Sequence, residues 1–259
     1  MRRLLPIVIG VIAIIAAGFF ALNRTRIEEV RRAAEQKTLP AAESLEEAVT
    51  EPETTSTPMA VAANISPKPN SITSEKNLAV PFTSQAPYGV WDEVHEETCE
   101  EASAAMVDAF YTKRTFTPES AERELLALVD WQKKRFGYFE DTSAEEVAVI
   151  LREYYKFPRV LISEEVTVSS IKREIARGNL IILPLYGRGL NPFFTPPGPD
   201  YHMLLVKGFT ETKFITNDPG TRRGADFTYT FDKLLSAVHD WNGGDVINGR
   251  RVMIIVFPK

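Results

Sequence analysis

Cysteine and histidine are scarce in this sequence, which has one cysteine and three histidines in 259 residues. A single thiol cannot form an internal disulfide, so a hydrophobic core has to hold the fold. The CxxC, HxxxH and HExxH spacings typical of zinc sites are missing, as is the phosphate-loop lysine motif of nucleotide-binding proteins. A net charge of −5 argues against a nucleic-acid partner. We therefore expect no metal, no cofactor, no nucleotide and no nucleic acid.

An uninterrupted apolar run, LLPIVIGVIAIIAAGFFAL, covers residues 4–22 and follows a short flank at 1–3. At about 1.5 Å per residue, a helix of this length crosses a hydrocarbon layer about 30 Å thick. We predict a transmembrane anchor. The alternative is a secretory signal peptide, because small residues near the end of the run are typical of a cleavage region: Ala16, Ala17 and Ala21.

The stretch 23–75 is predicted to be a flexible linker. Its larger part, 38–75, is rich in Pro, Thr, Ser, Glu and Ala and has no aromatic residue, so it cannot bury enough apolar surface to offset its ordering entropy. Residues 23–37 are alternatively an extension of the anchor helix. A stalk of this composition favours a domain held outside the cytoplasm, at the cell surface. The positive-inside rule favours the cytoplasm, because four arginines follow the apolar run: Arg24, Arg26, Arg31 and Arg32.

One domain is predicted for residues 76–259, which contain no second linker and no internal repeat. Apolar residues at helical spacing, together with capping patterns, predict helices at 99–111, 118–135, 143–155, 170–177 and 231–239. Short β-branched or aromatic runs predict strands at 180–185, 202–209, 214–217, 227–230 and 252–257. Helices followed by consecutive strands indicate an α+β fold with a mainly antiparallel sheet.

Cys99 is predicted at the first position of its helix. Thr98 and Glu101 form a capping-box pattern, and the unpaired N–H groups at a helix start stabilise a thiolate relative to a thiol. The alternative is a small buried hydrophobe, the common role of a free cysteine. Four glutamates oppose that role because carboxylates favour water, and they also oppose ionisation of the thiol: Glu96, Glu97, Glu100 and Glu101. A nucleophilic Cys99 therefore needs a cationic partner.

His202 is the histidine best placed to be that partner. It opens a predicted strand directly after the Gly- and Pro-rich segment 187–200, a position suited to facing a cleft. Asp218 lies 16 residues further on, so an odd-membered hairpin loop centred on Thr210 places it directly opposite His202. An even-membered loop selects Asn217 instead, and the polar residues of the loop leave this choice open.

Four motifs in this order resemble the papain-like cysteine peptidases that process bacteriocin double-glycine leaders, and more closely their stand-alone bacterial C39-like relatives. They are VPFTSQAPYGVW (80–91), TCEEASAAM (98–106), YHMLLVKGF (201–209) and ITNDPG (215–220). The resemblance implies a papain-like fold, with the cysteine helix in an N-terminal helical half and the histidine and aspartate on a C-terminal antiparallel sheet. It also implies that Cys99 is the nucleophile, His202 its ion-pair partner and general acid, Asp218 the residue that orients His202, and Gln85 the oxyanion donor.

The function implied by this resemblance is a membrane-anchored cysteine peptidase that hydrolyses amide bonds of a peptide or protein through an acyl-thioenzyme. Two alternatives are a catalytically idle binding module on a membrane stalk and a cell-wall hydrolase acting on peptidoglycan amides. The transporters of that family carry a membrane domain and an ATPase whose motifs are missing here, so leader export is not expected. Aromatic residues that are candidates to line a substrate groove are Trp91, Phe193, Phe194 and Tyr201.

Overall fold

The computed structural model describes residues 23–49 and 73–259. These residues fall into two compact units that divide between Leu39 and Pro40, and the first contains a helix at 23–36. This helix lies within residues 23–37, the part of the predicted linker that is alternatively an extension of the anchor helix. Within the described ranges, no helix is long and apolar enough to cross a membrane. The anchor or signal peptide predicted over 4–22 lies outside these ranges, together with the flank at 1–3.

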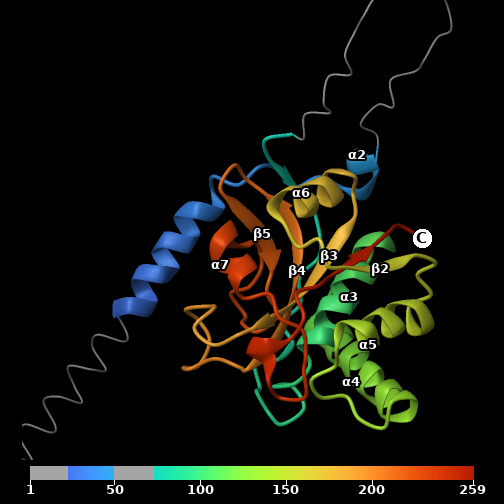
Figure 1. The fold of residues 1–259 in the computed structure, drawn as a ribbon. Helices are drawn as coiled ribbons and strands as arrows, with labels where there is room; N and C mark the ends of the chain where they lie inside the picture. The colour runs from blue at the N-terminus through green and yellow to red at the C-terminus, as the bar shows by residue number, and fades with distance from the viewer. Residues whose placement is uncertain (1–22, 50–72) are drawn as a thin grey trace, which may run out of the picture. The chain divides into compact units, whose positions relative to one another are not determined.

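Seven strands form one sheet in the second unit, and every strand pair in it is antiparallel (Figure 1). The order across the sheet is β2-β7-β3-β4-β5-β6, with β1 paired to β4. Two of these strands, β1 and β2, are missing from the sequence prediction. The strands are β1 (Lys76–Asn77), β2 (Val160–Ser163), β3 (Leu180–Tyr186), β4 (Tyr201–Phe209), β5 (Lys213–Asn217), β6 (Phe227–Thr230) and β7 (Met253–Val256).

The helices of this unit precede most of the strands along the chain, and the predicted α+β fold is confirmed. Capping boxes begin α4, α5 and α6. The predicted helix 143–155 is α5 followed by one π-helical stretch. The helices are α2 (Leu45–Val49), α3 (Cys99–Tyr111), α4 (Pro118–Arg135), α5 (Ala144–Val149), the π-helix Ile150–Tyr154, α6 (Val168–Ala176), α7 (Phe231–Ser236) and the 3-10 helix Val246–Asn248.

The helix α3 packs against β3 and β4 and also contacts α4 and α5, so all thirteen of its residues are buried. Small side chains allow this close approach: Ala102, Ala104, Ala105 and Ala109. The backbone N–H of Met203 in β4 reaches the Cys99 sulfur at 3.3 Å. Packing on the sheet therefore brings the first residue of α3 to the beginning of β4.

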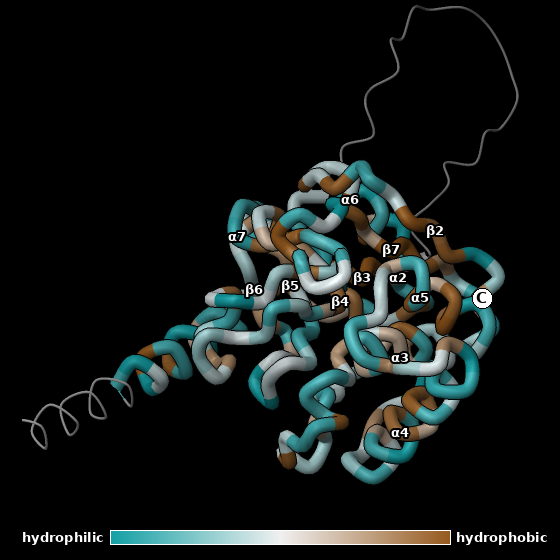
Figure 2. The backbone as a smooth tube through the Cα atoms, turned by 60° about the horizontal axis from the view of Figure 1, so that its bottom comes forward, coloured by the Kyte–Doolittle hydropathy of each residue, from teal (hydrophilic) through white to brown (hydrophobic). Residues whose placement is uncertain are grey.

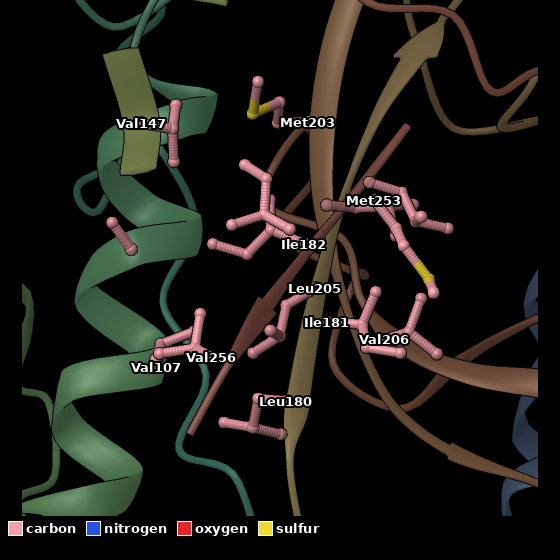
Figure 3. Close-up of a cluster of buried hydrophobic side chains, with 14 of the residues drawn as sticks. Val107, Val147, Leu180, Ile181, Ile182, Met203, Leu205, Val206, Met253 and Val256 are labelled. Carbon is pink, nitrogen blue, oxygen red and sulfur yellow. The ribbon is translucent and has the colours of Figure 1, made fainter. Parts of the chain in front are cut away.

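Both faces of the central strands are buried. Figure 3 shows Val107 of α3 beside the face that carries Leu180, Ile182, Leu205 and Val256, while Ile181, Val206 and Met253 lie on the other face. The helix α6 packs on β3 and β4, and α7 packs on β5 and β6. Strands covered on both sides are apolar throughout, which explains why LIILPL has no polar alternation.

The helix α4 is amphipathic, and hydrophobic and hydrophilic residues alternate along it in Figure 2. Its buried positions recur at three- or four-residue intervals, as one covered face requires: Ala121, Leu125, Leu128, Val129 and Gln132. The acidic residue Glu119 lies in its first turn, and three basic residues lie in its last turn, the arrangement that the helix dipole favours.

Residues 40–48 lie against the domain, which differs from the flexible linker predicted for 23–75. The N–H of Glu43 donates to Asn77 O (2.8 Å), and the N–H of Ala79 donates to Glu43 O (2.7 Å). The Glu43 carboxylate also pairs with the buried ammonium of Lys76 (3.0 Å), and Ala48 is buried. The composition of 38–75 indicates low hydrophobicity on average, but these few residues gain backbone partners along β1.

The packing of α3 on the sheet predicts a large cost for removing a buried side chain between them. Ile182→Ala should lower the free energy of unfolding by about 2–5 kcal/mol, because a buried cavity replaces the side chain. Denaturant titration of the full chain measures this change. The control is Leu161→Ala in β2, where the side chain is 43% exposed and the loss should stay below about 1 kcal/mol. Equal losses at the two positions would contradict the described packing.

Candidate active site

A cleft of about 460 Å³ lies where three segments meet: the loop before α3, the segment 193–202 and the turn that follows β5. Cys99, His202 and Gln85 all line it. The four aromatic residues expected in a substrate groove line it as well: Trp91, Phe193, Phe194 and Tyr201. The Phe194 ring stands edge-on to the His202 ring, with 5.1 Å between their centres.

Cys99 occupies the first position of α3, and its side chain is almost fully buried. Its Sγ donates a hydrogen bond to Glu100 Oε2 (3.1 Å) and accepts one from the Met203 N–H (3.3 Å). Among the described residues, no hydrogen bond joins Sγ to His202. The thiol is therefore held by its own helix and by β4, beside the histidine that lines the same cleft.

The environment of Cys99 favours the neutral thiol. Burial raises the pKa of Cys99 well above its usual value, and the charge of Glu100 and the hydrogen bond to it raise the pKa further. The Met203 N–H acts in the opposite direction, because it stabilises a thiolate. A nucleophilic thiolate at this position therefore needs groups that stabilise negative charge on the sulfur.

The two glutamates that follow Cys99 are not in water. Glu100 and Glu101 are 1% and 0% exposed, so the expectation that they favour solvent is wrong. The predicted capping box is wrong too, because Thr98 Oγ1 donates to Gln85 O (3.1 Å) and Glu101 accepts a hydrogen bond from Gln132 Nε2. Tertiary partners from the preceding loop and from α4 replace the local bonds of the capping pattern.

His202 and Asp218 are hydrogen-bonded to each other and both are buried. Nε2 of His202 lies 2.9 Å from Asp218 Oδ1, which leaves Nδ1 as the ring nitrogen available to another partner. Asn217, the alternative to Asp218, instead donates to Val80 O (3.2 Å). Asp218 is therefore the residue that contacts the imidazole.

The strand register that brings this pair together differs from the predicted one. Leu205 pairs with Asn217, which places Asp218 diagonally to His202, two residues away from the position directly opposite it. The hairpin loop has an even number of residues, because Phe209 pairs with Phe214, and a bulge at Lys207 shifts the register by one. Because of this shift, the side chains of Asp218 and His202 lie on the same face of the sheet, close enough for a diagonal contact.

Asp218 has further partners that the sequence analysis did not identify. Its Oδ2 accepts hydrogen bonds from Tyr229 Oη (2.5 Å) and Asn191 Nδ2 (2.8 Å), and its Oδ1 accepts one from the Gly220 N–H (3.1 Å). Burial alone raises the pKa of Asp218, but the charge of His202 and these side-chain hydrogen bonds lower the pKa below its usual value. An ionised carboxylate can only accept, so Nε2 of His202 donates the hydrogen bond between the two side chains.

Gln85 lines the cleft, but its amide group is engaged elsewhere. Nε2 donates to His95 O (2.8 Å) and Glu96 O (3.0 Å), and the buried Oε1 has no hydrogen-bond partner in the described part of the chain. In this conformation, both amide hydrogens point to the loop before α3. A role in binding an oxyanion requires release of at least one of these bonds.

The loop before α3 is held by His95. Its ring lies between Asp92 Oδ1 (2.7 Å from Nδ1) and Glu122 Oε2 (3.0 Å from Nε2), so it links the loop to α4 rather than to Cys99. Across residues 23–49 and 73–259, no group of three or more His, Cys, Asp or Glu side chains is arranged to hold a metal ion.

Charged side chains lie on two sides of the cleft. Glu96 and Glu97 precede α3, and Arg222 and Arg223 follow the Gly220 turn. The Arg223 guanidinium lies over the Phe193 ring, 5.1 Å from its centre. The cleft therefore offers aromatic surface between an acidic and a basic border.

Comparison with known proteins places this site in a family context. The profile of the Peptidase_C39 like family matches residues 77–243, which include all four residues predicted for the site. A solved structure of a candidate C39-like peptidase from Bacillus anthracis aligns with a TM-score of 0.46 and 12% identity, covering 70% of this chain and 96% of that one. A search of curated proteins gives no match.

The buried Glu101 predicts a dependence of stability on pH. Burial raises the pKa of Glu101 from 4.5 to about 8, against the opposing effect of hydrogen bonds from its own N–H and from Gln132. The folded state therefore binds this proton more tightly than the unfolded chain, and the resulting stabilisation is full below about pH 4.5 and is lost as the pH rises through about 8. Glu101→Gln removes the titration but keeps an acceptor for Gln132.

We expect the free energy of unfolding of the wild-type chain to fall relative to that of Glu101→Gln between these two pH values. Denaturant titrations of both proteins across this range measure the difference. Curves that run parallel would show that Glu101 titrates normally and would contradict its described burial.

Proposed function

We propose that this chain, which belongs to the C39-like peptidase family, is a cysteine peptidase that hydrolyses amide bonds in a peptide or protein substrate. One observation carries the proposal: Cys99 and His202 line the same cleft, and His202 is bonded to a buried, ionised Asp218. A thiol, an imidazole and a carboxylate in this order are the groups that acyl transfer through a thioester requires.

The proposed reaction begins with a Cys99 thiolate beside a protonated His202, and the sulfur attacks the substrate carbonyl carbon. The imidazolium then gives its proton to the leaving amine as the C–N bond breaks, and the acyl-thioenzyme remains. Water attacks this thioester with His202 as the base, and the acid product leaves as the thiolate and the imidazolium are restored. Asp218 keeps the ring in one orientation and stabilises its charged form.

Gln85 is our candidate for the side chain that binds the developing oxyanion. Its position on the cleft wall supports this role, and its two bonds to His95 O and Glu96 O oppose it in the described conformation. We propose that substrate binding redirects the amide toward the cleft. An oxyanion donor of this kind contributes about 2.7–4 kcal/mol to transition-state stabilisation in comparable sites.

A catalytically idle binding module is the second candidate function. It is favoured by the surroundings of Cys99, where Sγ bonds Glu100 and where burial and the Glu100 charge keep the pKa of Cys99 high. The two functions make opposite predictions for the reactivity of the sulfur, so one labelling experiment separates them.

An electrophilic peptide, such as a peptidyl vinyl sulfone, should alkylate the full chain in detergent at neutral pH. Because the sequence has one cysteine, mass spectrometry assigns any thiol adduct to Cys99. His202→Ala should slow the labelling by at least about 100-fold, since it removes the imidazolium that stabilises the thiolate. Labelling that is absent, or that is equal in wild type and His202→Ala, would reject the peptidase and favour the binding module.

Gln85→Ala provides a matched variant on the same cleft wall. It should leave alkylation within a few fold of wild type but lower kcat by about 100- to 1000-fold on any peptide that the wild type cleaves, because the donor acts on the oxyanion and not on the thiol. Equal kcat values would assign Gln85 only to the support of the loop before α3.

We also propose that the run 4–22 anchors the chain in a membrane, with the domain outside the cytoplasm. The length of the apolar run and the composition of the stretch after it support this arrangement. Digestion of the domain by a protease added to intact cells is the expected result. Protection from that protease until the cells are opened would place the domain in the cytoplasm, as the arginines after the run favour.

A further inference from the structure

Glu100 bonds the nucleophile directly, but the proposed reaction gives it no role. Its Oε2 accepts the Cys99 S–H at 3.1 Å, and both side chains are buried. The Met203 N–H approaches the same sulfur at 3.3 Å, so Sγ lies between one acceptor and one donor. The carboxyl group is thus in direct contact with the reacting atom, and its own side chain is buried.

The groups around Glu100 are acidic or neutral. Glu101 follows it in α3, Asp141 comes from the connection between α4 and α5, and Tyr201 comes from β4. In the portion of the chain that the structure describes, no lysine, arginine or histidine forms an ion pair with Glu100. Burial and then the charge of Glu101 raise the pKa of Glu100 well above its usual value, while the hydrogen bond from Cys99 lowers it. The carboxylate is therefore stabilised by the S–H and readily takes up a proton.

Three groups can carry protons here: the Cys99 thiol, the Glu100 carboxyl that bonds it and the His202 ring that lines the same cleft as Cys99. Their summed charge is zero when they hold two protons. One such state has a thiol, a carboxylate and an imidazolium. Another has a thiolate, a carboxylic acid and an imidazolium, and it differs from the first by one proton moved between Sγ and Oε2.

We propose that Glu100 is a positioning residue that exchanges this proton with Cys99. In the resting site, the carboxylate accepts the S–H and holds the sulfur as a thiol. In the reactive site, the S–H bond breaks, its electron pair stays on sulfur and Oε2 carries the proton, so that a carboxylic acid and the Met203 N–H both donate to the thiolate. This proposal rests on Cys99 being the nucleophile, and it assigns a role to a glutamate that otherwise opposes ionisation of the thiol.

The test is the pH dependence of iodoacetamide alkylation of Cys99, measured on the full chain in detergent. Glu100→Gln keeps the size of the side chain and an amide donor to sulfur, but it removes the negative charge. We expect its alkylation midpoint to lie at least about one pH unit below that of wild type, which gives about tenfold faster reaction at a pH below both midpoints. A midpoint equal to or higher than that of wild type would overturn the proposal.

Glu101→Gln is the matched control, because Glu101 is buried in the next position but bonds Gln132 instead of the sulfur. The pH midpoint of alkylation in Glu101→Gln should shift by less than half as much as the midpoint in Glu100→Gln. Equal shifts would show that only the general charge of the acidic residues matters and would also reject a specific role for Glu100. Thermal unfolding of both variants confirms that they are folded.

A second measurement needs no variant of Glu100. Infrared spectroscopy of the wild-type chain detects an S–H stretching band that only Cys99 can produce. The proposal expects this band, displaced as in a hydrogen-bonded thiol, at neutral pH in the absence of substrate. A missing band would mean that the thiolate is already present, which contradicts the resting state. Both readouts report the protonation of Cys99 and not turnover. The proposal for Glu100 can therefore fail while His202→Ala still slows labelling, and the peptidase proposal can fail while both readouts agree with the role of Glu100.

Discussion

The contact between the first residue of α3 and the beginning of β4 is the constraint on which the site depends. The Met203 N–H donates to Cys99 Sγ at 3.3 Å, and the residue before Met203 is the histidine of the cleft. This contact forms because α3 is buried along its whole length, with small side chains against β3 and β4. The core that stabilises the domain therefore also sets the distance between the thiol segment and the imidazole segment.

The buried carboxyl groups bonded to His202 and to Cys99, and their neighbour Glu101, differ in how their charges are compensated. Asp218 is ionised among three hydrogen-bond donors and a histidine, which lowers its pKa. Glu100 and Glu101 are buried with far fewer donors, and burial raises the pKa of both. Carboxyl groups whose pKa values are moved in opposite directions by their surroundings are typical of sites that hold and move protons. The arrangement suits a nucleophile that is kept neutral until a substrate enters.

Much of this fold follows from patterns in the sequence. The bounds of α3 and α4 agree with their apolar spacing, and β3 and β4 are recognisable as short apolar runs because both of their faces are covered. The parts that are not predictable depend on partners distant in sequence. Thr98 has a capping pattern but bonds Gln85 O, and Asn191 and Tyr229 have no local feature that indicates a contact with Asp218.

The register of β4 and β5 shows the same limit. Counting residues through the even-membered loop selects Asn217, and only the bulge at Lys207 places Asp218 on the face of His202. The buried ammonium of Lys207 bonds Asn77 and Asp226, contacts that no hairpin rule contains. The burial of Glu100 and Glu101 is similarly hidden, because composition alone assigns carboxylates to the surface. Local propensity thus predicts the elements, and long-range polar bonds decide the details of the site.

The central claim is that Cys99 and His202 act as one unit, and a crystal structure of the chain after reaction with a peptidyl vinyl sulfone tests it most directly. The account predicts a covalent bond to Sγ, a peptide lying along the aromatic surface of the cleft, and Nδ1 of His202 within hydrogen-bond reach of the sulfur. An adduct whose sulfur still faces Glu100, with the His202 ring turned away from it, would contradict the account.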